Sequence, residues 1–265
     1  MPLTVVTWNI NSVRLRLPLV LRLLAEVRPD VLCLQETKCP NELFPREAFE
    51  AAGHPHIAVH GQKGYHGVAT ISRVPLADAN SRDYCLMGDT RHLSTTLDFD
   101  GKPLRLHNFY VPAGGDEPDP SVNPKFDHKL RFIEEMRCVR AGADGASDIL
   151  VGDLNIAPEE ADVWSSKQLR NVVSHTDVER TAMRDLIANG PWSDLMRHGR
   201  DPDERIYTWW SYRNRDWRAS NRGRRLDHVW GSADLTDRLR GIDVMVEARD
   251  WEKPSDHVPV VARFD

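Results

Sequence analysis

The sequence predicts an α/β protein in which two packed, mixed β-sheets are flanked by helices. Three observations favour this fold class: about ten short strand-like runs, few helical segments between them, and a hairpin signal between two neighbouring runs. So many strands do not fit one sheet in strict alternation with helices, whereas two sheets that share a core accommodate them. We expect residues 1–265 to form a single domain of this kind.

The strand-like runs share apolar and β-branched residues and are bounded by turn-forming residues. They are Leu3–Trp8, Val31–Gln35, His56–His60, Gly67–Ser72, Leu93–Phe99, Leu104–Tyr110, Ile149–Val151, Leu226–Gly231, Ile242–Ala248 and Val258–Phe264. The fifth and sixth runs are joined by Asp100-Gly101-Lys102-Pro103, in which Asp-Gly is a turn signal. We therefore expect these two runs to form an antiparallel hairpin.

Three segments have the pattern of a helix. Leu17–Val27 is closed by Arg28-Pro29, and Val178–Asn189 is followed by Gly190-Pro191. In the third segment, apolar residues four, three and three positions apart predict one buried face. That face consists of Phe126, Leu130, Ile133 and Met136.

Composition points away from a membrane protein. Hydrophobic residues make up 40% of the chain and charged residues 28%, which predicts a sizeable core and a soluble surface. No run approaches the roughly 18 apolar residues that span a bilayer, so no membrane partner is expected. The four cysteines show no paired spacing, which predicts buried, reduced thiols in a cytoplasmic protein. They are Cys33, Cys39, Cys85 and Cys138.

The formal net charge of −5 conceals a basic segment between Arg205 and Arg225, where seven arginines accompany one acid, Asp216. Three tryptophans lie in the same segment: Trp209, Trp210 and Trp217. Guanidinium groups that alternate with large rings suit a nucleic-acid surface, because the cations meet phosphates and the rings pack against sugars and bases. A solvated arginine-rich loop with core tryptophans is the alternative, and composition alone does not separate the two.

Polar residues stand at six strand boundaries. Singly, such a residue is most often a turn residue or a helix cap. Together they indicate a shared ligand, because burying so many ionisable groups without one costs too much free energy. The six boundaries carry Asn9, Gln35-Glu36, Asn108 with Tyr110, Asp153 with Asn155, Asp227, and Asp256-His257. If the last two strands run antiparallel to the others, all six boundaries meet at one edge.

Such a set of groups suits metal-dependent hydrolysis of a phosphodiester. Mg²⁺ binds through few carboxylates and keeps waters and substrate oxygens, and Glu36 is the expected carboxylate. Asp153 is the candidate to orient and deprotonate the attacking water, with Asn155 holding it in place.

The remaining groups can stabilise charge on the phosphate. His257, oriented by Asp227, is expected to donate a hydrogen bond to a non-bridging oxygen. Tyr110 is a phenol that can donate a hydrogen bond to the phosphate or to the leaving oxygen.

As placed along the chain, these residues resemble the exonuclease III family of apurinic/apyrimidinic (AP) endonucleases, of the bacterial exodeoxyribonuclease III type, within the endonuclease/exonuclease/phosphatase superfamily. The resemblance covers essentially the whole chain and rests on seven motifs in family order. The motifs are Trp8-Asn9-Ile10-Asn11-Ser12-Val13-Arg14, Leu34-Gln35-Glu36-Thr37-Lys38, Gly64-Tyr65-His66-Gly67-Val68-Ala69, Asn108-Phe109-Tyr110-Val111-Pro112, Gly152-Asp153-Leu154-Asn155-Ile156-Ala157-Pro158, Asn221-Arg222-Gly223-Arg224-Arg225-Leu226-Asp227 and Ser255-Asp256-His257.

The resemblance implies a four-layer α/β sandwich and DNA repair chemistry. The expected activity is Mg²⁺- or Mn²⁺-dependent cleavage 5′ to abasic sites, together with 3′→5′ exonuclease activity and removal of 3′ blocking groups. The expected partners are double-stranded DNA and abasic-site DNA, bound by a monomer.

The resemblance also assigns roles to individual residues. It implies catalytic roles for Tyr110, Asp153, Asn155, Asp227 and His257. It implies a metal and phosphate site made by Asn9, Glu36, Asp153, Asn155, Asp256 and His257. It implies DNA contacts from Arg14, Lys38, Trp209, Asn221, Arg224 and Leu226, of which Trp209 and Leu226 wall a pocket for the extruded abasic nucleotide. The chain departs from the family pattern at Asn11, Ala113 and Arg224.

Two alternatives remain open at this stage. The first is another phosphoesterase of the superfamily, acting on phosphoinositides, sphingomyelin or RNA tails, although the basic segment from Arg205 to Arg225 suits a duplex better than a small head group. The second is a nucleic-acid-binding regulator that has lost catalysis. Such a regulator is expected to lack some carboxylates or the histidine, and all of them are present here.

Overall fold

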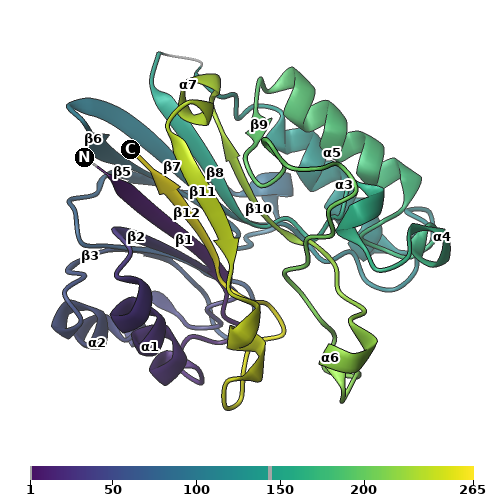
Figure 1. The fold of residues 1–265 in the computed structure, drawn as a ribbon, viewed down its shortest axis with the longest axis horizontal. Coiled ribbons are helices and arrows are strands. Elements are labelled where there is room, and N and C mark those ends of the chain that lie inside the picture. The colour runs from purple at the N-terminus through teal and green to yellow at the C-terminus, as the bar shows by residue number, and fades with distance from the viewer. Residues whose placement is uncertain (1, 143–144) are drawn as a thin grey trace.

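Two six-stranded sheets pack face to face and helices cover both outer surfaces (Figure 1). The computed structural model describes residues 2–142 and 145–265. Helices α1 and α2 lie on one side of the sheet pair, and α3 and α5 lie on the other. The predicted four-layer α/β sandwich is confirmed.

The first sheet has the strand order β11-β12-β1-β2-β4-β3. Its strands are β1 (Leu3–Asn9), β2 (Val31–Gln35), β3 (His56–His60), β4 (Val68–Ser72), β11 (Leu239–Val244) and β12 (Val260–Phe264). β1 runs parallel to β2 and antiparallel to β12, so the first and last strands of the chain are neighbours.

The second sheet has the strand order β5-β6-β7-β8-β10-β9. Its strands are β5 (Ala77–Asn80), β6 (His92–Phe99), β7 (Lys102–Tyr110), β8 (Ser147–Asp153), β9 (Ser193–Asp194) and β10 (Asp227–Gly231). β6 and β7 form the predicted antiparallel hairpin, with Phe99 paired to Lys102. Asp100 and Gly101 between them both have positive φ, as a two-residue hairpin turn requires.

Most helices are short. The α-helices are α1 (Leu17–Val27), α2 (Arg46–Ala51), α3 (Pro124–Met136), α4 (Ser166–Leu169), α5 (Asp177–Asn189), α6 (Trp217–Ser220) and α7 (Ala233–Thr236). Four 3₁₀ turns complete the described elements: Asn41–Leu43, Tyr84–Leu86, Glu160–Asp162 and Val246–Asp250. The α5 helix begins with a capping box, in which the side chains of Thr176 and Glu179 each bond to the other's backbone N–H. None of the described helices is long and apolar enough to cross a membrane.

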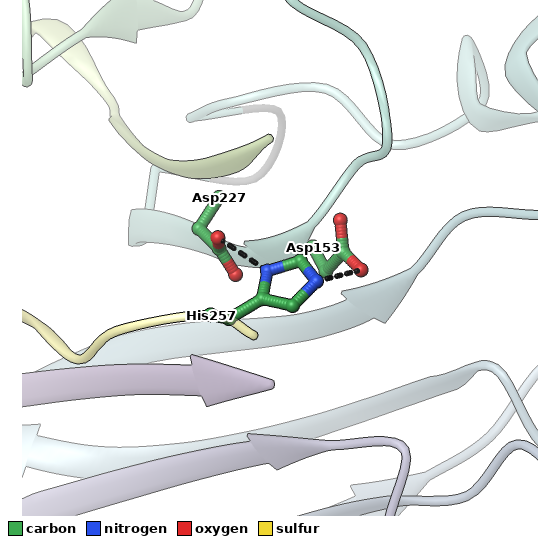
Figure 2. A group of neighbouring side chains, drawn as sticks. All are labelled: Asp153, Asp227 and His257. Carbon is green, nitrogen blue, oxygen red and sulfur yellow. Dashed lines mark hydrogen bonds and ion pairs between the residues drawn. The ribbon is translucent and has the colours of Figure 1, made fainter. Parts of the chain in front are cut away.

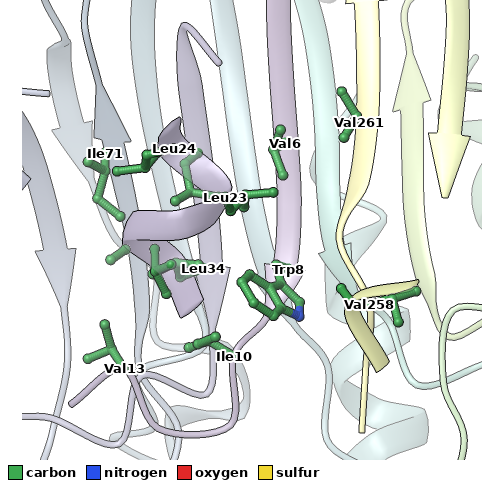
Figure 3. Close-up of a cluster of buried hydrophobic side chains, with 14 of the residues drawn as sticks. Val6, Trp8, Ile10, Val13, Leu23, Leu24, Leu34, Ile71, Val258 and Val261 are labelled. Atoms are coloured by element: carbon green, nitrogen blue, oxygen red, sulfur yellow. The ribbon is translucent and has the colours of Figure 1, made fainter. Parts of the chain in front are cut away.

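Apolar side chains fill three interfaces between the four layers. On the outer face of the first sheet, Val6, Trp8 and Leu34 pack against Leu23 and Leu24 of α1 (Figure 3). Each such buried side chain contributes about 1.5–3 kcal/mol, more than a typical surface ion pair. These contacts therefore dominate the stability of the outer layer.

The inner core lies between the two sheets. Val5 and Cys33 from the first sheet meet Leu106, Ile149 and Val229 from the second. Residues alternate across each strand, so the neighbours of these residues face outward to the helices.

The outer face of the second sheet is covered by α3 and α5. Phe109 and Leu150 of the sheet pack against Phe132 of α3 and against Met183 and Leu186 of α5. Both helices therefore depend on this sheet for their burial.

A polar contact joins the two sheets near the edge that carries the polar residues. Gln35 of β2 donates from Nε2 to Oδ1 of Asn108 in β7 at 2.8 Å. Asn108 in turn donates to the backbone oxygens of Leu34 and Ala69, at 3.2 and 3.0 Å. Both side chains are fully buried. Two of the polar residues found at strand boundaries thus hold the sheets together.

Several predicted details are wrong. In α3 the buried face includes Lys129, whereas Leu130 is only half-buried. The helix can bury Lys129 because the ammonium has a buried partner, the carboxylate of Glu179, at 2.5 Å. The strand predicted at Ile242–Ala248 is β11, which ends at Val244, and Val246–Asp250 is a 3₁₀ turn.

One cysteine and six short elements also differ from expectation. Cys138 is exposed, so the prediction of four buried thiols fails there, while the other three are buried. The sequence analysis missed β5, β9 and α2, as well as the four-residue helices α4, α6 and α7. The four residues of β5 are all exposed, β9 has two residues, and α2 has six. None of these segments is long enough to show a periodic apolar pattern.

A buried network of charges supports the base of the second sheet. Arg225 and Asp162 are both fully buried, and the guanidinium bonds both carboxylate oxygens at 2.8 Å. Arg225 also donates to Asp194 at 2.8 Å, and Arg197 pairs with Asp162. Burial alone raises the pKa of Asp162, but the two arginines lower it to about 2.

Asp162→Asn should therefore destabilise the protein strongly, because it leaves buried guanidinium groups without a compensating charge. We expect a loss of about 3–5 kcal/mol in the free energy of unfolding. The control is Glu26→Gln, which breaks the exposed Arg22–Glu26 pair and should cost less than about 1 kcal/mol. Urea denaturation measures both, and similar small losses in the two variants would contradict the prediction.

Candidate active site

The polar strand boundaries meet at one edge of the sandwich. β1 and β2 are parallel, as are β7 and β8, so their carboxyl ends point the same way within each sheet. β10 runs antiparallel to β8 and β12 antiparallel to β1, so these strands bring Asp227 and His257 to the same edge from their amino ends. The register pairs Asp153 with both Tyr110 and Asp227. The predicted convergence is confirmed.

His257 lies between two buried carboxylates (Figure 2). Its Nδ1 is 2.8 Å from Oδ2 of Asp227, and its Nε2 is 3.6 Å from Oδ2 of Asp153. Trp8 fixes the backbone by donating from Nε1 to the oxygen of His257 at 3.0 Å. Trp8 of the first sheet and the two aspartates of the second sheet therefore fix the position of the His257 ring.

The electrostatics keep a proton on His257. Burial alone lowers the pKa of this imidazole, but the carboxylates of Asp227 and Asp153 raise it well above its usual value. Burial also raises the pKa of Asp153, an effect that the His257 imidazolium opposes and Asp227 reinforces. The ring is therefore a cationic hydrogen-bond donor with Nε2 toward Asp153.

Glu36 and Asp153 share one amide. Asn9 donates from Nδ2 to Oε1 of Glu36 at 2.9 Å and to Oδ2 of Asp153 at 2.8 Å. Oδ1 of Asn9 accepts the backbone N–H of Asn11 at 3.0 Å. The Lys38 ammonium lies 2.9 Å from Oε2 of Glu36. Burial alone raises the pKa of Glu36, but Lys38 and Asn9 lower it below its usual value, so this carboxylate is ionised at neutral pH.

The donor set suits a hard divalent cation beside Glu36. The ionised carboxylate of Glu36 and the carboxylate of Asp153 are both bonded by Asn9 and so lie close together, and Lys38 neutralises only part of the charge on Glu36. Asp153, Asp227 and His257 also lie close enough together to surround an ion. That second position is less suitable, because a protonated imidazole has no lone pair to offer.

Asp256 and Asn155 belong to the same cluster. Asp256 accepts hydrogen bonds from Nδ2 of Asn11 at 3.1 Å and from Nε1 of Trp209 at 3.0 Å. Asn155, which has positive φ, donates from its backbone and side chain to Asp153 at 3.0 and 3.1 Å. The structure brings both residues to the site, and their roles as metal ligands stay predictions.

Tyr110 closes the side of the site next to Glu36. Burial, reinforced by the carboxylates of Glu36 and Asp153, raises the pKa of Tyr110 well above its usual value. Arg91 stacks over its ring at 4.8 Å, and the His66 ring lies 6.2 Å away. The phenol is therefore neutral and able to donate a hydrogen bond.

A cleft of about 1060 Å³ opens from these groups. Its lining includes Glu36, Asp153 and His257, together with apolar side chains and Arg224. The apolar side chains are Trp164, Leu169, Val172, Val173, Trp209 and Leu226. Trp209 and Leu226 thus line the same cleft as Asp153 and His257, and their role as walls of an abasic-nucleotide pocket stays a prediction.

The other predicted DNA contacts lie outside this cleft or at its edge. Lys38 is half-buried and bound to Glu36. Arg14 is exposed. Asn221 is exposed and accepts a hydrogen bond from Nε1 of Trp210 at 3.1 Å. Their contacts with DNA stay predictions.

Some residues of the basic segment from Arg205 to Arg225 belong to the protein core, and others lie on the surface of the cleft. Arg225 and Trp210 are buried, so they belong to the core. Arg213 and Arg222 are exposed and line the cleft. Arg218 pairs with Asp250.

Sequence reasoning missed a buried pair that supports the site from below. Lys129 donates to the backbone oxygens of Asn155 and Ala113, at 2.8 and 3.3 Å. Its partner Glu179 accepts the backbone N–H of Ser174 at 2.9 Å. The pair therefore ties the loop with Asn155 to the pocket wall. Glu179 was visible only as part of a capping box, and Lys129 only as a charge beside a helix face.

The sequence pattern of the endonuclease/exonuclease/phosphatase family matches residues 6–257. The chain therefore belongs to this family. The geometry above contains the carboxylates, amides and histidine that the resemblance implied from the sequence.

Individual relatives indicate the group within the family to which the chain is most similar. The exodeoxyribonuclease III of Haemophilus influenzae is 29% identical over 276 residues, covering 98% of each chain. An AP endonuclease from Archaeoglobus fulgidus superposes with a TM-score of 0.90 at 33% identity, covering 99% of both chains. A 3′ phosphatase, NExo from Neisseria, bound to a product DNA hairpin, gives a TM-score of 0.89 at 32% identity, covering 99% of both chains. Within the family, the chain is a DNA repair nuclease of the exonuclease III and AP endonuclease group, as predicted.

Removing the carboxylate of Asp227 should lower the pKa of His257. In the metal-free protein, the midpoint of the His257 titration should fall by about one to three pH units in Asp227→Asn. The imidazole would then lose its proton on raising the pH through a lower range than in the wild type. Imidazole ¹⁵N NMR measures the midpoint, Asp243→Asn on β11 is the control, and an unchanged midpoint would show that Asp227 does not hold the charge.

Proposed function

We propose that this protein is a Mg²⁺-dependent nuclease that incises double-stranded DNA 5′ to abasic sites and removes nucleotides and blocking groups from 3′ ends. Mn²⁺ is expected to substitute for Mg²⁺, and we expect the protein to act as a monomer in the cytoplasm. The observation that carries the proposal is the Asp227–His257–Asp153 arrangement beside Glu36 at the mouth of a partly apolar pocket.

In the proposed reaction, a water oxygen attacks the phosphorus while the bond from phosphorus to the 3′ oxygen breaks. Asp153 orients the water and accepts its proton, and its raised pKa suits this role. The products are a 3′ hydroxyl, which gains a proton, and a 5′ phosphate that carries the abasic sugar. Asn155 and Asn9 hold the Asp153 carboxylate in position.

Two hydrogen-bond donors, one cationic and one neutral, stabilise the negative charge on the phosphate. His257, kept protonated by Asp227, donates to a non-bridging oxygen. Tyr110 donates from its neutral phenol on the side of Glu36. A divalent cation, when bound by Glu36, neutralises charge on the phosphate and on the leaving oxygen.

The pocket beside these groups explains the preference for an abasic nucleotide. Trp209 and Leu226 present apolar surface to a sugar without a base. Extruding such a nucleotide costs little, because no base pair or full stack is broken. The regulator without catalysis is not favoured, because Glu36, Asp153 and His257 are all present and converge.

One assay tests the proposal. A duplex with a single tetrahydrofuran abasic analogue should be incised 5′ to the analogue with Mg²⁺ or Mn²⁺ and left intact with EDTA. Asp153→Asn should lower the rate of incision by at least about 100-fold, because the proton acceptor is lost, while binding to the duplex is retained. Undamaged duplex is the control for exonuclease shortening. Full activity of Asp153→Asn would remove this residue from its proposed role.

The exposed arginines of the basic segment, two of which line the cleft, should contribute to the salt dependence of DNA binding. Replacing Arg213, Arg215 and Arg222 by Gln should reduce the slope of log affinity against log salt by about 0.9 for each phosphate that the protein no longer neutralises. The matched control replaces three exposed arginines on other elements, Arg131, Arg240 and Arg263. Fluorescence anisotropy gives both slopes, and equal slopes in the two triple variants would place the DNA elsewhere.

A further inference from the structure

Arg224 is a cation inside the pocket rather than on the protein surface. The backbone of Trp209 pairs with that of Arg224 through two hydrogen bonds of 3.0 Å and forms a bridge with His257 on its other side. Arg224 is therefore two backbone spacings, roughly 10 Å, from the histidine of the catalytic cluster. Arg224 and His257 line the same cleft.

The neighbours of Arg224 in the sequence show that its placement is distinct. Arg225 points to the opposite side and is neutralised by Asp162 and Asp194. Leu226, two residues on, lines the pocket with Arg224. Arg222 is exposed and stacks over Trp164 at 4.7 Å.

The hydrogen-bonding capacity of Arg224 is only partly used. Nη1 donates to the backbone oxygen of Val173 at 3.1 Å and to Oγ of Ser174 at 2.8 Å. Nε is buried without a hydrogen-bond partner. Among the described residues, no carboxylate lies within ion-pair distance of this guanidinium, and the nearest buried acid, Glu179, is already paired with Lys129.

A partly buried guanidinium without a carboxylate partner stabilises an anion that enters beside it. The surrounding wall is apolar, with Trp209 stacked at 5.3 Å and Leu226 alongside, so the interaction is screened less than it would be at the surface. Arginine also matches the planar, two-oxygen geometry of a carboxylate. The pocket is therefore built for a negatively charged group next to the scissile phosphate.

We propose that Arg224 is a specificity-determining residue that makes this enzyme prefer 3′ ends whose blocking group carries a carboxylate, such as a 3′-phosphoglycolate. This inference rests on the proposed function. A water oxygen bonds to the phosphorus, the bond from phosphorus to the 3′ oxygen breaks, the 3′ oxygen gains a proton, and phosphoglycolate leaves. Arg224 and Ser174 hold the carboxylate of the glycolate while the phosphate lies at Asp153 and His257.

The test compares two gapped duplexes with Mg²⁺. One ends in 3′-phosphoglycolate and the other in the corresponding 3′-phosphoglycolamide, which has the same shape without the charge. The wild type should show a kcat/KM about tenfold or more higher for the carboxylate, the charge preference. Arg224→Gln, which keeps a donor for Val173, should abolish this preference, and Arg224→Lys should retain part of it. Arg218→Gln removes an equal charge from the same segment and should leave the preference unchanged.

Two outcomes would overturn the inference: equal rates of the wild type on the two ends, or a charge preference that survives in Arg224→Gln. The first comparison needs no variant, so it decides the matter even where Arg224→Gln folds poorly. Thermal unfolding of each variant separates the alternative of a purely structural arginine, for which stability falls and the preference is unchanged. Incision of the tetrahydrofuran duplex without any charge preference would leave the proposed function standing, whereas no cleavage of any of the three substrates would overturn both.

Discussion

The site depends on the two sheets being held at one fixed offset, and a buried amide contact sets that offset. Gln35 and Asn108 bond across the inner interface, while apolar contacts elsewhere in that interface have no direction. An unmade hydrogen bond between buried amides is costly, so sliding one sheet past the other is strongly disfavoured. This constraint brings Asn9, whose amide also bonds Glu36 of the same sheet, within hydrogen-bonding reach of Asp153 from the other sheet.

Buried ion pairs are a second feature on which the structure depends. Lys129 with Glu179, and Arg225 with Asp162, are fully buried ion pairs. Lys129 also bonds the backbone of Asn155 beside the site. Desolvation makes these pairs poor sources of net stability, but each fixes loops that would otherwise be free to move. Glu36, Asp153 and His257 differ from these pairs because they line an open cleft, where the proposed phosphate and cation can reach them.

The sequence predicted the architecture well because long, regular features carry it. Alternating apolar runs located the central strands, and the Asp100-Gly101 turn located the hairpin. Residues such as Asp153 and His257 were recognisable because they end or precede such runs. The pairing of Lys129 with Glu179 joins residues fifty positions apart on two helices, and the division of Arg224 from Arg225 depends on which side of an extended segment each faces. Local patterns hold no information of that kind.

The bond from Trp8 to the backbone of His257 joins positions 249 apart in the sequence. Ser255 adds a second link by donating to the backbone oxygen of Asn9 at 2.7 Å. During synthesis, the amino-terminal strand must wait for nearly all of the chain before it gains these partners, since loop closure over such a separation comes late. The Asp153–His257 cluster is therefore assembled only after residues 255–257 have been synthesised and have reached the amino-terminal strand.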